Sequence, residues 1–170
     1  MQPLRILWQN LRPSRSAVRQ IFFRRCCMTP SFAEVDIRPP HVVQVRVVGD
    51  STDENFTAYI DATERALASL DQFVVLYDTG GLTQLPARHR DQFNTWLKDT
   101  RRRFEGRWLG TAFVIRQRVL RGALQAMFWL VSPYYPYKVV SSVDEGWAWL
   151  EQQLQNNGLP VPSRPPQTVD

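Results

Sequence analysis

The sequence is poor in the two side chains that most metal and redox sites need. Its 170 residues include two cysteines and two histidines. Cys26 and Cys27 are adjacent, so a structural disulfide between them is not expected, and neither His41 nor His89 has a cysteine or a second histidine nearby. A zinc site usually takes four such ligands. We therefore expect no metal site, no cofactor and a reducing, cytoplasmic location.

Long hydrophobic runs are also lacking. The longest apolar stretch, from Val119 to Val131, is interrupted by Arg121 and Gln125. It is shorter than the roughly 20 apolar residues that a membrane-spanning helix needs. The sequence therefore predicts no transmembrane segment.

Recognisable catalytic motifs are missing as well. Neither histidine follows a Gly-x-Ser-x-Gly nucleophile elbow, and there is no Gly-x-x-x-x-Gly-Lys phosphate-binding loop. No Ser/His/Asp set can be assembled from the sequence, and the acidic residues mostly open helices or face solvent. We expect no catalytic residues and interpret the chain as non-enzymatic.

The positive net charge of +5 comes from the start of the chain. Residues 1–33 contain six of the 21 basic residues and none of the 16 acids. A globular nucleic-acid binder usually carries its basic excess on the folded domain, so no nucleic acid is expected as a partner.

Residues 1–30 form a basic extension, for which three interpretations are open. It is translated upstream sequence with Met28 as the true start, a disordered tail, or a targeting or anionic-membrane contact through residues 1–27.

Apolar strands alternate with helix-period segments through residues 31–157. Strands are predicted at 34–38, 42–48, 73–77, 108–115 and 137–140, and helices at 51–70, 86–104, 119–131 and 142–157. The order β-β-α-β-α-β-α-β-α predicts a single α/β domain with a mixed sheet of about five strands and about four helices. Residues 158–170 contain four prolines and are predicted to be a disordered tail.

Two helix starts carry a capping-box pattern, in which a serine side chain and a glutamate three residues later satisfy each other's backbone amides. The first runs from Ser51 to Glu54 and the second from Ser142 to Glu145. Gly106 is the predicted stop of the 86–104 helix.

Two segments resemble one family. They are Val74-Val75-Leu76-Tyr77-Asp78-Thr79-Gly80-Gly81-Leu82 and Val139-Val140-Ser141-Ser142-Val143-Asp144-Glu145-Gly146-Trp147-Ala148-Trp149-Leu150. With the element order, they resemble the STAS fold of anti-sigma-factor antagonists and sulfate-transporter tails over residues 33–155. The SpoIIAA-like or STAS/SEC14-like group is the most similar.

This resemblance implies a regulatory module that binds a protein partner, or its own copy, through the loop after the central strand and the adjacent helix. The SEC14-like side of the group implies the alternative of small-ligand or lipid binding. Anti-sigma antagonists carry a phosphorylatable serine where the second helix begins. Pro86-Ala87-Arg88 stands there in this chain, so kinase control through that position is not expected.

The loop Asp78-Thr79-Gly80-Gly81 is the first candidate contact site. It follows a central strand, where open α/β sheets usually bind ligands. Its glycines would let a backbone or a phosphate approach closely, and its amides could form an anion nest. The alternative is a structural turn in which a glycine adopts positive φ.

Arginines and tyrosines supply the other candidates. Arg116, Arg118 and Arg121 follow the 108–115 strand, where they could bind a carboxylate or phosphate of a partner, or could be solvated surface residues. Tyr134 and Tyr135 lie in a proline-rich loop. They are candidates for an interface, and the alternative is that they cap the core.

Overall fold

The computed structural model describes residues 31–38, 40–118, 121–122, 124, 128 and 133–163. The basic extension with its two cysteines lies outside the described residues, as does most of the predicted helix at 119–131. So does the end of the predicted tail, residues 164–170.

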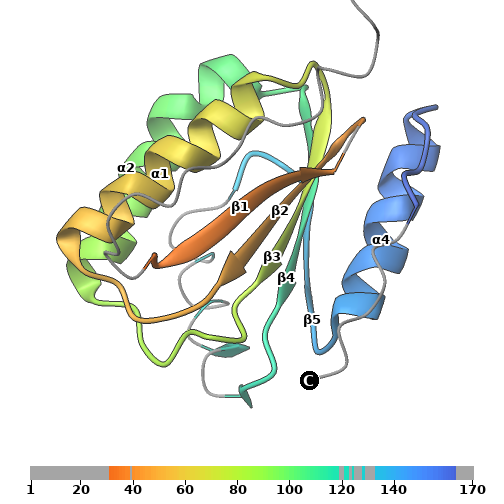
Figure 1. Cartoon of the computed structure of the whole chain (residues 1–170). Coiled ribbons are helices and arrows are strands. Elements are labelled where there is room, and N and C mark those ends of the chain that lie inside the picture. Colours follow the sequence, from red (N-terminus) through yellow and green to blue (C-terminus); the bar gives the residue numbers. More distant parts are fainter. Residues whose placement is uncertain are drawn as a thin grey trace, which may run out of the picture.

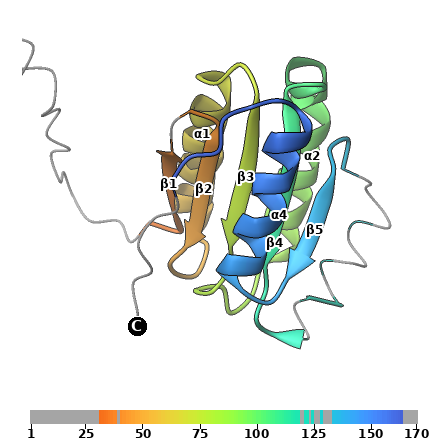
Figure 2. The same cartoon turned by 90° about the vertical axis from the view of Figure 1, so that its right-hand side faces the viewer.

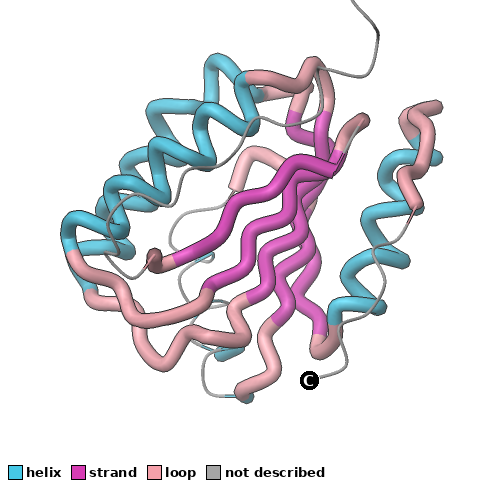
Figure 3. The backbone as a smooth tube through the Cα atoms, in the orientation of Figure 1, coloured by secondary structure: helices cyan, strands magenta, loops and turns pink. Residues whose placement is uncertain are grey.

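Five strands form one mixed sheet, as predicted. They are β1 (Ala33–Arg38), β2 (Val42–Val47), β3 (Phe73–Asp78), β4 (Trp108–Val114) and β5 (Tyr137–Val140), and they lie in the sheet in that order. β1 and β2 are antiparallel, and the remaining neighbours are parallel. Figure 3 shows the strands stacked side by side with a continuous twist. The parallel strands all end at one edge of the sheet.

Helices cover both faces of this sheet. α1 (Asp53–Ala68) and α2 (Ala87–Phe104) lie together on one face, and α4 (Val143–Asn156) lies on the other (Figures 1 and 2). Successive side chains of a strand point to opposite faces. In β3, for example, Val75 packs toward α1 and α2 while Val74 and Leu76 pack toward α4.

The two faces have different cores. The face under α1 and α2 is rich in aromatic side chains, which include Phe56, Tyr59, Phe73, Trp96 and Trp108. The face under α4 is mostly aliphatic. Its buried residues are Val42, Val74, Leu76, Ala112, Val114, Val140, Trp147, Leu150 and Leu154, and Trp149 packs against them partly buried. The cavity described below lies on the first of these two faces.

The helix starts differ from the predicted capping boxes. The first box, predicted at Ser51–Glu54, is wrong by one residue: Thr52 is the N-cap of α1 and accepts a hydrogen bond from the Asn55 amide. The Asn55 side chain accepts from the Thr52 amide at 2.7 Å. At the second box Ser142 is the N-cap of α4, as predicted, but the Glu145 carboxylate accepts from Ser141 rather than from Ser142.

The C-terminal half of α2 is held against α1 by polar contacts to one glutamate, and it ends at a glycine. Gly106, two residues beyond α2, has φ of +78°, which confirms it as the helix stop. Near that end Arg103 forms an ion pair with Glu64 of α1, and the Trp96 indole donates to the same carboxylate at 2.9 Å. These hydrogen bonds lower the pKa of Glu64.

None of the helices in the described ranges has the length and hydrophobicity that a membrane crossing requires.

Candidate ligand-binding site

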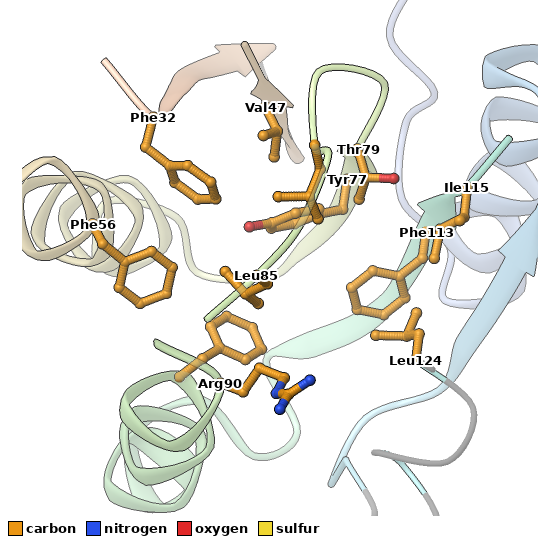
Figure 4. A pocket seen from close by; sticks show the side chains of 12 residues that line it. Phe32, Val47, Phe56, Tyr77, Thr79, Leu85, Arg90, Phe113, Ile115 and Leu124 are labelled. Carbon is orange, nitrogen blue, oxygen red and sulfur yellow. The ribbon is translucent and has the colours of Figure 1, made fainter. Parts of the chain in front are cut away.

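A cavity of about 130 Å³ lies between the α1–α2 layer and the sheet. Figure 4 shows side chains from the helices and the strands pointing toward one another around it. Most of its walls are apolar. The lining residues are Phe32, Val47, Phe56, Tyr77, Thr79, Leu82, Leu85, Arg90, Phe93, Phe113, Ile115 and Leu124.

The position of the cavity follows from the topology. β3 and β4 are parallel, and Tyr77 and Phe113 pair near their carboxyl ends. The loop after β3 adds Leu82 and Leu85, and the first turns of α2 add Arg90. The cavity therefore lies at the carboxyl edge of the central strands, where α/β sheets generally bind ligands.

Two hydroxyl groups at the cavity are already hydrogen-bonded. The Tyr77 hydroxyl donates to that of Tyr59 at 2.6 Å, and the Thr79 hydroxyl donates to the Val114 carbonyl at 2.8 Å. Burial is the main cause that raises the pKa of both tyrosines. Both rings are therefore neutral at physiological pH, and they add no charge to the cavity.

Arg90 is the one charged residue among the described residues that line the cavity. It is an exposed residue on α2, one turn before Phe93, so the cavity reaches the surface beside it. Its guanidinium makes no ion pair or hydrogen bond within the described part of the chain. Among the described residues, the site thus combines an apolar interior with one free cation at its edge.

The predicted Asp78–Gly81 loop is tied to both neighbouring strands. Asp78 forms an ion pair with Arg116, with Oδ1 and Nη1 3.3 Å apart, and accepts a hydrogen bond from the Gly80 amide. The Gly81 amide donates to the Val47 carbonyl at 3.1 Å. The expectation of a positive φ in this loop is wrong: among the described glycines, positive φ occurs at Gly106 and Gly158.

Gly81 is required for a different reason. A Cβ at this position would lie 2.4 Å from the Val47 carbonyl oxygen and 2.9 Å from the Val48 backbone. No side chain can be accommodated that close to a backbone, so the glycine lets the loop cross β2 at short range. Gly80 has a looser constraint, because its Cβ would meet the movable Arg116 side chain.

The three predicted arginines have different surroundings. Arg116 pairs with Asp78, and Arg121 donates to the Ile115 carbonyl at 2.9 Å. Arg118 is exposed and makes no hydrogen bond or ion pair among the residues described. Of the three, Arg118 alone presents a guanidinium without such a partner.

The predicted tyrosines lie elsewhere. Tyr135 is 4% exposed and stacks on Trp108, with ring centroids 4.0 Å apart, and Tyr134 packs edge-on against the same indole. Trp108 begins β4, whereas Asp78 ends the parallel strand β3. The tyrosines and the loop are therefore at opposite ends of the sheet. Their packing corresponds to the alternative in which they cap the core.

The structure also joins residues that sequence reasoning left separate. The Ser51 hydroxyl is 2.7 Å from Nδ1 of His89, and Nε2 of His89 is 2.9 Å from the Asp53 carboxylate. His89 is 1% exposed and stacks on Phe56, a wall of the cavity. Arg88 also pairs with Asp53.

This network links the start of α1 to the first turn of α2, and so fixes two walls of the cavity relative to each other. No local sequence motif predicts this network, because Ser51 and His89 are 38 positions apart in the sequence. Within the described ranges, no group of three or more His, Cys, Asp and Glu residues has a metal-binding arrangement.

Comparison with known proteins identifies the fold. No protein-family model matches the sequence, and no curated protein does. A crystal structure of an uncharacterised Shewanella loihica protein, from the DUF3478 family with a SpoIIAA-like fold, superposes with a TM-score of 0.51. The match covers 69% of this chain and 91% of that one. The chain has a SpoIIAA-like fold.

At 16% identity this likeness concerns the fold alone. It confirms the resemblance found in the sequence and the α/β class with a mixed five-stranded sheet.

Replacing Gly81 by alanine tests the close approach of the loop to β2. We expect Gly81→Ala to lower the free energy of unfolding by about 2 kcal/mol, in the range of overpacked sites. Urea unfolding followed by circular dichroism gives the value. Gly49→Ala is the matched control, because a Cβ there meets no atom within 4 Å. Equal stability of the two variants would contradict the account of Gly81.

Removing the His89 ring tests the link between α1 and α2. We expect His89→Ala to cost about 2 to 3 kcal/mol in unfolding free energy, since it removes a buried ring with its two part-buried hydrogen bonds and leaves a void. Arg88→Ala is the control, because it removes an exposed ion pair to the same Asp53 and should cost under about 1 kcal/mol. A His89→Ala protein as stable as wild type would refute the link.

Proposed function

We propose that this protein is a non-enzymatic regulatory domain that binds a small apolar molecule in the cavity between α2 and the sheet. The observation that carries the proposal is the cavity itself, which is enclosed by apolar walls and opens beside one cation. An engineered apolar cavity of about 150 Å³ binds benzene. A space of about 130 Å³ therefore suits a single ring or a short aliphatic chain.

The size favours a small molecule over a lipid. The two acyl chains of a phospholipid are several times larger than one aromatic ring, and the cavity would have to expand greatly to admit them. We therefore favour small-ligand binding within the SpoIIAA-like fold. The chemistry of the walls supports a binding role rather than catalysis, because the Tyr77 and Thr79 hydroxyls are both engaged in hydrogen bonds.

Binding to a protein partner is the second candidate. Thr79 and Leu82 line the cavity, while Gly80 and Gly81 of the same loop are exposed. A ligand and a partner would therefore contact opposite sides of one loop. Arg118 follows β4 at the same edge of the sheet and has a free guanidinium within the described residues. This arrangement supports a partner surface formed by Asp78–Gly81, the start of α2 and Arg118.

Small-ligand binding is tested by titrating benzyl alcohol into the ¹⁵N-labelled full chain. We expect saturable amide shifts centred on Thr79, Arg90 and Phe113. Leu85→Trp should abolish them, because the larger ring fills the cavity from the loop side. The control is Ile37→Trp, which adds the same ring at an exposed position on β1.

A well-dispersed spectrum shows that the Leu85→Trp variant is folded, and Leu82→Trp offers a second way to fill the cavity. Absence of saturable shifts in the wild type would contradict the proposal. So would unchanged binding in both folded tryptophan variants.

The partner surface is tested by affinity capture from the native host with the full chain and with Arg118→Glu. We expect a protein that wild type retains to be lost by the variant, since the substitution reverses a charge at the surface. Arg65→Glu, on the exposed side of α1, is the control and should retain it. Identical capture by wild type and Arg118→Glu would contradict this second candidate.

A further inference from the structure

We propose that the ligand of the cavity is a small carboxylate, with its ring or short chain inside the cavity and its carboxylate on the Arg90 guanidinium. This inference rests on the proposed function and specifies the ligand class. It depends on the chemistry of one residue, and it can fail while binding of neutral molecules still holds.

The charge balance around α2 supports an anion. Three other arginines of α2 form ion pairs: Arg88 with Asp53, Arg101 with Glu105, and Arg103 with Glu64. Arg90 and Arg102 have no acidic partner in the described part of the chain, and of these two it is Arg90 that lines the cavity. The cavity is thus lined by an arginine whose charge no described acid balances.

The hydrogen bonds of the wall hydroxyls also indicate that a carboxylate would bind at Arg90. Tyr77 and Thr79 already donate their hydroxyl protons to Tyr59 and to the Val114 carbonyl. They offer no free donor to a ligand. A carboxylate would consequently be placed at Arg90, where the planar guanidinium can donate two parallel hydrogen bonds.

The surroundings of Arg90 strengthen such a contact. Phe93, one turn further along α2, and Leu124 line the cavity beside it, as Figure 4 shows for Arg90 and Leu124. A charge-assisted hydrogen bond next to apolar groups is stronger than one fully exposed to water. The combination of an apolar interior and one cation selects a molecule with an apolar body and a single negative end.

The test compares benzoate with benzyl alcohol, which has nearly the same size and no charge. Both are titrated into the ¹⁵N-labelled full chain, the Arg90→Gln variant and the Arg118→Gln variant. We expect wild type to bind benzoate about tenfold more tightly than benzyl alcohol, the difference that one charge-assisted contact typically makes. Arg118→Gln removes the same charge outside the cavity and should keep this preference.

Arg90→Gln should bind the two molecules equally, because it has lost the charge that favours benzoate. A well-dispersed spectrum shows that the variant is folded. Equal binding of the two molecules by wild type, or a benzoate preference that survives in Arg90→Gln, would overturn the carboxylate inference and leave the proposed function standing. If neither molecule binds wild type, both proposals fail.

Discussion

The burial of β3 on both faces is the constraint on which the rest of the structure depends. Val74 and Leu76 of this strand pack against α4, while Phe73 and Val75 pack against the aromatic layer under α1 and α2. A strand enclosed in this way needs a helical layer on each side, and parallel neighbours joined by crossover helices provide them. The sheet order β1-β2-β3-β4-β5 places β3 at the centre.

The cavity arises where this packing is incomplete. At the carboxyl ends of β3 and β4 the chain leaves the sheet, and the loop before α2 closes the space with Leu82 and Leu85. That loop is held rigidly. Gly81 crosses close to β2, and Asp78 binds Arg116 beyond the end of β4. Strong fixation of the walls lets a small apolar space persist, and such spaces bind small apolar molecules.

Much of the fold could be predicted from the sequence, because it depends on local periodicity. The strand Tyr137–Val140 was predicted with its observed bounds. The end of α2 at Gly106 could be predicted because a glycine follows an amphipathic segment there. The cavity, by contrast, brings together residues as distant in sequence as Phe32 and Leu124. The first capping box was misplaced for the same reason: Ser51 bonds to His89, a residue of another helix, and Thr52 takes over the N-cap. Contacts of this kind have no local signature.

If the space between α2 and the sheet is a ligand site with an apolar interior and a cationic edge, benzoate should occupy it. A crystal structure of the full chain grown with benzoate shows whether it does. We expect electron density for the ring between Phe93 and Phe113, with the carboxylate within hydrogen-bonding distance of the Arg90 guanidinium. A closed, empty cavity at saturating benzoate, or benzoate bound only elsewhere on the surface, would contradict it.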